Sequence, residues 1–271
     1  MAQRISHYLI VTGALFSLGA TCQTANFRVE APTPEVAKQI AKASEKFRKE
    51  LALAWLSEEM PRWPEPCQLI VTLTMDDACG STSFTFSDRG LLSQKMEIRG
   101  PLGRLLISIL PHEIAHTVFA YHFGKPVPRW ADEGGAVLSE GKSQGDRHDR
   151  ILRKALRTDK KLPLSRLLAL REYPKDSEVF YAQAHSLTRF LVEKSDKEKF
   201  LQFVAQGMKD GWNDAVRMHY GYETIEELEE AWMESLGAPG QCRSEKSTKR
   251  RRIFTAKPDL LTSQMGRRMV K

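Results

Sequence analysis

The stretch His112-Glu113-Ile114-Ala115-His116 decides how the rest of the chain is interpreted. In a helix, residues four apart lie on one face about a turn from each other, so both imidazoles can reach one metal ion. Neutral imidazole nitrogens suit zinc, and the carboxylate of Glu113 can take a proton from a water molecule that the metal holds. The stretch therefore predicts a helix that carries a zinc site and the base for a hydrolytic reaction.

Short strands are predicted to precede this helix. Thr33 and Pro34 have the pattern of a helix start, and apolar residues at helical spacing extend that first helix to about Met60. β-branched runs and alternating patterns predict strands at residues 27–30, 68–74, 81–86 and 95–99. The motif helix is expected to begin near Leu102, to be kinked or restarted by Pro111, and to run unbroken to Gly124.

The region after the motif is predicted to be mainly helical. A second helix should start near Trp130, and helical patterns return from Leu162 onward. Ser177 is the expected cap of one helix; the others are predicted at residues 197–208, 212–220 and 224–237, the last opened by a capping box. The fold class is therefore α+β, with a small mixed or antiparallel sheet over the motif helix and a helical C-terminal half.

A catalytic zinc site needs a third protein ligand and one open position. His122 lies six residues after His116, but in an unbroken helix it points roughly 80° away from His112. That orientation argues against His122. Glu133, on the next helix, is the other candidate, with its neighbour Asp132 as an alternative.

The stretch from about Leu105 to Glu140 resembles the gluzincins, zinc peptidases with H-E-x-x-H and a downstream Glu as third ligand. It is most similar to shorter bacterial, peptidase MA-like members, in which Pro-Arg-Trp, a Glu-Gly pair and a small residue follow the motif. These are Pro128-Arg129-Trp130, Glu133-Gly134 and Ala136 in this chain. The resemblance implies a zincin-like fold in which His112, His116 and Glu133 bind Zn²⁺ and Glu113 is the general base and later proton donor.

Two further positions follow from the resemblance. Thermolysin-like gluzincins have an Asp four residues after the ligand Glu, which orients a ligand His. This chain has Val137 there, so another residue must do so, and Asp132 is a candidate. Gluzincins also use a Tyr or His from the following helix to stabilise the oxyanion. Tyr181 and His185 are the candidates here, and simple packing is the alternative.

Residues 1–24 have the pattern of a secretory signal peptide. A positive start with Arg4, an apolar run at residues 9–20 and small residues after it predict cleavage between Ala20 and Ala25. We therefore expect a secreted, periplasmic or cell-envelope protein with no transmembrane span once the signal is removed. Cys22 offers a lipid anchor as an alternative, but Gly19-Ala20-Thr21 lacks the large aliphatic residue that usually stands three before such a Cys.

Charge and cysteine content set further limits. The net charge of the chain is +7, but residues 243–271 carry ten Lys or Arg against Glu245 and Asp259, so the other residues sum to −1. Residues 25–240 are predicted to form the zincin-like domain, and residues 241–271 a basic, disordered tail. An oxidising compartment favours a bridge between Cys67 and Cys79, although the sequence does not choose among the possible pairings.

These patterns predict a secreted zinc-dependent peptidase that acts on peptide or protein substrates. The alternative is a catalytically silent zinc-binding module that serves in adhesion or cell-envelope association. The basic run at residues 249–252 could contact nucleic acid, but the signal peptide argues against such a partner. Nothing in the sequence predicts an oligomeric state.

Overall fold

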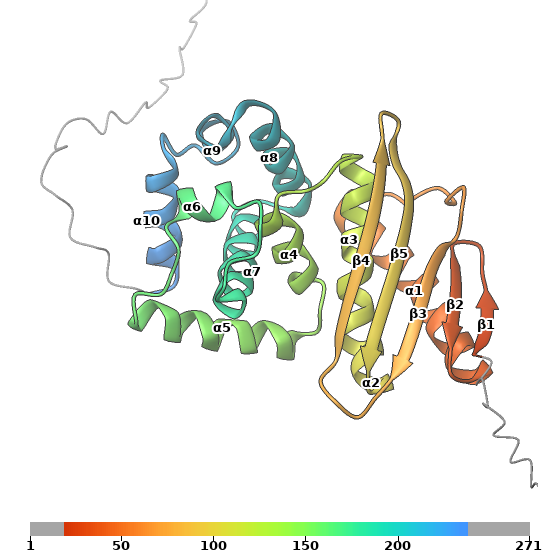
Figure 1. The fold of residues 1–271 in the computed structure, drawn as a ribbon. Helices are drawn as coiled ribbons and strands as arrows, with labels where there is room; N and C mark the ends of the chain where they lie inside the picture. Colours follow the sequence, from red (N-terminus) through yellow and green to blue (C-terminus); the bar gives the residue numbers. More distant parts are fainter. Residues whose placement is uncertain (1–18, 238–271) are drawn as a thin grey trace, which may run out of the picture.

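A five-stranded sheet forms the N-terminal half of the protein in the computed structural model, which describes residues 19–237 (Figure 1). Its strands, in chain order, are β1 (Ala20–Gln23), β2 (Phe27–Ala31), β3 (Cys67–Leu73), β4 (Cys79–Ser87) and β5 (Gly90–Gly100). The order in the sheet is β1-β2-β3-β5-β4. β2, β3 and β5 are parallel neighbours, whereas β1 and β4 pair antiparallel at the two edges. The predicted mixed sheet is confirmed.

The helices divide into a layer on the sheet and a helical half beyond it. α1 (Pro34–Leu56) and α3 (Leu110–Phe123) pack against each other and against the sheet. The helices that follow lie on the far side of α3 (Figure 1): α4 (Arg129–Leu138), α5 (Lys142–Arg157), α6 (Leu164–Ala169), α7 (Ser177–Glu193), α8 (Lys197–Asp210), α9 (Trp212–Tyr220) and α10 (Ile225–Ser235). Among these described helices, none is long and apolar enough to cross a membrane.

The alternation of side chains along the strands explains which face of the sheet is covered. Successive side chains of a strand point to opposite faces, so every second residue can enter the core. Phe27, Val29, Leu69, Met96 and Ile98 are buried on the face that α1 and α3 cover. The intervening residues are mostly charged or polar and lie on the solvent side. The predicted α+β fold, with the sheet laid over the motif helix, is confirmed.

Pro111 is accommodated in a way that the sequence did not predict. A proline inside a helix lacks an N–H group, and its ring clashes with the carbonyl four residues earlier. The short helix α2 (Leu102–Arg104) leads into a π-helical turn, η1 (Leu105–Ile109), in which the Leu110 N–H donates to the Leu105 carbonyl. Of the two expected outcomes, a kink or a restart, the structure shows the restart: α3 begins at Leu110, directly after this wider turn. α3 then runs unbroken, as predicted, to Gly124, whose φ is 60°.

The expected bridge between Cys67 and Cys79 is wrong: both are free thiols, as is Cys22. The sheet order explains why. Cys67 begins β3 and Cys79 begins β4, but β5 lies between these two strands. Moreover, Cys79 pairs with Arg99, which pairs with Thr72, so Cys79 stands level with the other end of β3.

Several boundaries also differ from the prediction. β1 begins inside the segment predicted to be a signal peptide, and α5 was not predicted as a helix of its own. Asp176 rather than Ser177 caps α7, because its side chain accepts a hydrogen bond from the Val179 N–H. The apolar run of the predicted signal peptide, as far as residue 18, and the predicted basic tail lie outside the described residues.

Candidate metal centre

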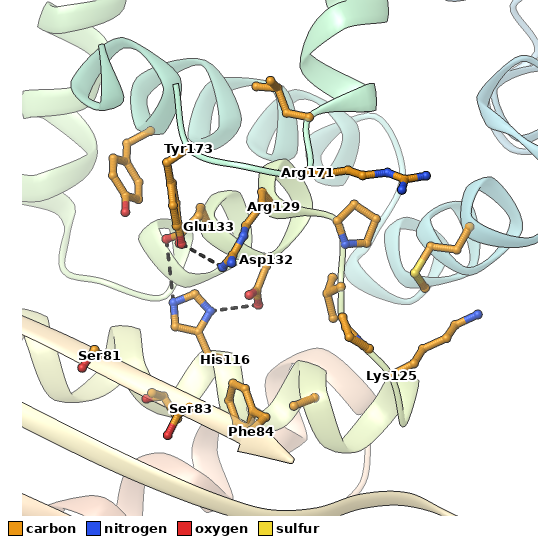
Figure 2. A pocket seen from close by; sticks show the side chains of 18 of the residues that line it. Ser81, Ser83, Phe84, His116, Lys125, Arg129, Asp132, Glu133, Arg171 and Tyr173 are labelled. Carbon is orange, nitrogen blue, oxygen red and sulfur yellow. Dashed lines mark hydrogen bonds and ion pairs between the residues drawn. The ribbon is translucent and has the colours of Figure 1, made fainter. Parts of the chain in front are cut away.

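His112, His116 and Glu133 meet at one point between α3 and α4. Glu133 Oε2 lies 3.4 Å from His112 Nε2 and 3.7 Å from His116 Nε2. One potential ligand atom from each residue lies within 4.8 Å of the others. The two histidines share a face of α3 because they are four residues apart. The structure therefore brings together the three residues predicted as metal ligands (Figure 2).

Two glycines explain how α4 comes close enough for Glu133 to reach the histidines. A methyl group at Gly135 would overlap the ring of Phe119 on α3, and one at Gly134 would overlap Thr188 on α7. On its other side α4 is anchored by buried Trp130, whose ring packs against Phe200 of α8. The Glu133-Gly134-Gly135 sequence thus combines a candidate ligand with the two small residues that its approach requires.

Carboxylates hold the outer nitrogen of each histidine. His112 Nδ1 lies 2.8 Å from Glu140 Oε1, just beyond the end of α4, and Glu140 also accepts a hydrogen bond from Ser108 of the π-helical turn. His116 Nδ1 lies 2.8 Å from Asp132 Oδ1. When an imidazole Nδ1–H faces a carboxylate, its Nε2 lone pair is left free and aimed at a ligand. Asp132 therefore contacts a ligand histidine, and Val137 needs no such role.

The charges of this cluster depend on one another. Burial alone would lower the pKa of His112, but Glu133 and Glu140 raise it to about 10. Burial likewise opposes protonation of His116, whose pKa Asp132 and Glu133 raise to about 9. Burial would raise the pKa of Glu133, but the two histidines and Tyr173 lower it to about 2. The imidazoles and carboxylates of the cluster thus stabilise each other's charged forms.

The donor set fits a divalent metal ion. Glu133 Oε2 is buried and accepts no hydrogen bond from any residue that the structure describes, although it lies between two imidazole nitrogens. Two neutral imidazoles and one carboxylate are a common set of three protein ligands for catalytic zinc. A bound ion would satisfy this oxygen and replace the protons on the two Nε2 atoms.

Glu113 contacts the edge strand of the sheet. Its carboxylate accepts a hydrogen bond of 2.7 Å from the Thr82 hydroxyl of β4. Thr82 pairs with Met96 of β5, so both side chains lie on the α3 face of the sheet. Gly80, two residues before Thr82, leaves room for the carboxylate, because a methyl group there would lie 2.5 Å from Glu113 Oε1. The edge strand therefore fixes where this carboxylate lies.

The cluster opens into a cleft of about 1160 Å³ between the two halves of the protein. β4 and α3 form one wall, and the loop before α4, the loop before α7, and the facing ends of α8 and α9 form the other. His112, Glu113, His116 and Glu133 all line it. The volume lies just above the range of about 300–1,000 Å³ that is usual for small-molecule pockets.

A sequence model of the Peptidase MA superfamily matches residues 103–238, half of the chain. The chain belongs to the Peptidase MA superfamily. The match includes both histidines, Glu133 and the helices that follow, and it begins after the last strand of the sheet. Among curated proteins and among solved structures, none matches this Peptidase MA member significantly.

Two tyrosines line the cleft, and the sequence predicted one of them as a site residue but not the other. Tyr181, a predicted candidate, lines the cleft from α7, and burial raises its pKa to about 12. Tyr173, which was missed, lies on the loop before α7 and stacks on Tyr181 with ring centroids 6.2 Å apart. Its hydroxyl donates to Glu133 Oε1 and accepts a 3.0 Å hydrogen bond from Arg129 (Figure 2). No spacing pattern in the sequence links Tyr173 to the metal motif.

The other two candidate histidines lie away from the ligand cluster of this Peptidase MA domain. His185 is buried on α7 beside His148 of α5 and is not among the residues that line the cleft. His122 lies near the end of α3, where it is exposed and packs against Phe123. Glu140 was missed as a site residue because it follows α4 in a segment with no recognisable motif.

Proposed function

We propose that the protein is a zinc-dependent peptidase that hydrolyses peptide bonds in the cleft. One observation carries this proposal: the His112–His116–Glu133 cluster and the carboxylate of Glu113 line the same open cleft. A zinc site used only for structure is normally closed by a fourth protein ligand. Here three candidate ligands lie at the wall of a cavity, so a fourth position is accessible to water and substrate.

The roles of the residues follow from where they lie. When bound, a zinc ion would polarise a water molecule and the scissile carbonyl. Glu113, held by Thr82, takes the proton of the attacking water and later gives it to the leaving amine. Tyr173 and Tyr181 are phenols at the same wall, and their raised pKa values keep them as hydrogen-bond donors. Tyr181 can donate to the oxygen on which negative charge develops, whereas the single O–H of Tyr173 already donates to Glu133.

The edge strand β4 gives the substrate a place to bind. β4 pairs only with β5 among the described strands, and residues 80–84 and 86 of it line the cleft. An extended peptide can add to such an edge through main-chain hydrogen bonds. Thr82 lies on this strand beside Glu113, so a peptide paired there would pass the base.

The test compares wild type with Glu113→Gln in cleavage of an unstructured protein such as casein. The amide cannot take the proton, and loss of a general base costs on the order of a hundredfold to ten-thousandfold in rate. Zinc content should stay near one ion per chain, because Glu113 is not a ligand. The matched control is Glu178→Gln, an exposed carboxylate paired with Arg147 outside the cleft.

Two results would contradict this assignment. Equal rates in wild type and Glu113→Gln would show that Glu113 is not the base. Zinc-loaded wild type that cleaves no peptide in a broad library would favour the silent zinc-binding module in adhesion or cell-envelope association.

We also propose that the chain is exported after removal of an N-terminal signal. The predicted cleavage window between Ala20 and Ala25 overlaps β1, which pairs with β2 from Ala20 to Gln23. Cleavage at the start of this window, after Ala20, would remove only the first residue of the strand, whereas lipidation at Cys22 would remove its first two residues. Mass spectrometry of the mature amino terminus distinguishes these cases, and an intact Met1 or Ala2 would exclude export by this route.

A further inference from the structure

The acidic and the basic side chains that line the cleft differ in their partners. Its carboxylates are Glu113, Asp132 and Glu133, all at the metal centre. Each is already engaged: Glu113 by Thr82, Asp132 by His116, and Glu133 by the two histidines and Tyr173. No lining carboxylate therefore remains for a cation elsewhere in the cleft.

The lysine and arginines of the cleft have no such partners. Lys125, Arg129 and Arg171 come from the loop after α3, the start of α4 and the loop before α7. Within residues 19–237, none of them lies within 4.0 Å of a carboxylate oxygen. Arg129 is held by a neutral group, because it donates to the Tyr173 hydroxyl and stacks over its ring at 4.6 Å. Lys125 and Arg171 are exposed.

Two of these cations lie toward one end of the cleft. Figure 2 shows Lys125 and Arg171 on the side of the view away from the pair of His116 and Glu133. Apolar side chains share this cleft, among them Phe84 of β4, Met208 of α8 and Trp212 of α9. Apolar side chains and unpaired positive charges therefore share the cleft with the metal centre.

We propose that Lys125 and Arg171 select peptides that carry a carboxylate within a few residues of the scissile bond. The inference rests on the proposed peptidase function. A cleft lined by one sign of charge concentrates ligands of the opposite sign. A guanidinium matches a carboxylate with two parallel hydrogen bonds, and an ammonium group acts as a point charge. An acidic side chain or a free C-terminal carboxylate supplies the same chemistry.

The expected preference is moderate. An exposed ion pair changes affinity by about 1.5- to 5-fold, so two cations acting together predict about tenfold tighter binding. The preference should shrink at high salt, because exposed charges are screened. Arg129 contributes as well, but its bond to Tyr173 ties it to the metal centre, so it is a poor test of selectivity.

The experiment measures binding rather than turnover. Zinc-loaded Glu113→Gln binds four fluorescent peptides in an anisotropy assay: one sequence with Glu or Gln beside the central bond, each with a free or an amidated C-terminus. The preference for carboxylate peptides should be about tenfold, and it should fall severalfold in Arg171→Gln and in Lys125→Gln built on the same background. Arg150→Gln is the control, because Arg150 is exposed on α5, outside the cleft, and its loss changes net charge equally.

Each outcome decides the proposal. If the preference follows Glu over Gln, the source is an acidic side chain; if it follows the free terminus, the source is the C-terminal carboxylate. Equal binding of all four peptides, no binding, or an equal loss in Arg150→Gln and Arg171→Gln would overturn it. A wild type that binds with this preference but cleaves nothing would overturn the peptidase function alone.

Discussion

Two pairs of histidines have their rings close together in this protein, and they have opposite properties. His112 and His116 have ring centroids 4.9 Å apart on α3, and His148 and His185 have centroids 5.9 Å apart between α5 and α7. Carboxylates raise the pKa values of the first pair to about 10 and about 9. Burial lowers the pKa of His148 and brings that of His185 to about 4.

The difference lies in the partners of the ring nitrogens. Each histidine of α3 has a carboxylate at Nδ1 and shares Glu133 at Nε2. Neither ring nitrogen of His185 has a hydrogen-bond partner among the described residues. Burial and proximity alone therefore do not identify a metal site. The distinguishing feature is the carboxylates, which orient the imidazoles and favour their protonated form.

Loss of a ligand histidine should have the largest effect. We expect His116→Ala to lose the zinc that wild type retains, about one ion per chain, since only two of three protein ligands remain. His185→Leu should keep its zinc. Metal analysis after dialysis against a weak chelator measures both. Equal zinc loss in the two variants would show that the two histidine pairs do not differ in metal binding.

Low pH should reduce the stability of the fold through His185 of the second pair. The folded pKa of His185 is about 4 against an ordinary 6.5, so the unfolded chain takes up a proton between these values and the folded chain does not. The stability from neutral His185 is therefore present above pH 6.5 and is lost as pH falls toward 4. The loss is up to about 3 kcal/mol, at 1.36 kcal/mol per pKa unit.

The variant His185→Leu removes this titration. Denaturant unfolding of metal-free protein, in steps from pH 7 to pH 4, should show a flatter pH dependence in the variant than in wild type. His148, Asp149 and Arg189 contribute to the environment of His185 and are present in both proteins, so the difference isolates His185. Parallel curves would show that His185 is not kept neutral by burial.

The carboxylates behind the ligands should have a smaller effect. We expect Glu140→Gln and Asp132→Asn each to weaken zinc binding by about tenfold to a hundredfold, because groups that orient metal ligands typically contribute this much. Competition with a fluorescent zinc chelator measures the affinity. Glu178→Gln serves as the control. Unchanged affinity in both site variants would mean that the carboxylates do not distinguish the two histidine pairs.

His122→Ala should have the smallest effect. Its ring is exposed and packs on Phe123, and it belongs to neither pair. We expect zinc content and cleavage rate to stay within about twofold of wild type, as for most surface substitutions. A loss of zinc in this variant would restore the hypothesis of a third histidine ligand on α3.

Local patterns account for most of what the sequence predicted. The four-residue spacing of His112 and His116 placed both rings on one face, and the absence of a break before Gly124 correctly separated His122 from them. Alternation located β3, β4 and β5 to within a few residues. Glu133 came from family resemblance. Its approach depends on Gly134 and Gly135 packing against α7 and α3, which no local pattern reveals.

The missed features depend on contacts between distant segments. Glu140 reaches His112 across 28 residues, and Tyr173 reaches Glu133 across 40. Neither residue has a local spacing that marks it. β1 was assigned to a signal segment because its small residues suit both a cleavage site and a short edge strand. The sequence therefore located the candidate ligands and Asp132 behind one of them, but not Glu140 or Tyr173.

The π-helical turn before Pro111 contains one residue more than an α-helical turn. Deleting one residue between Leu105 and Ile109 would restore ordinary pitch and leave the spacing of His112 and His116 untouched. The proline ring would then meet the carbonyl four residues earlier, so such a deletion should be accepted only together with replacement of Pro111. A deletion between the two histidines would instead turn one imidazole by roughly 100° about the helix axis. Chain length before this position can therefore vary only together with the proline, and the spacing after it cannot vary.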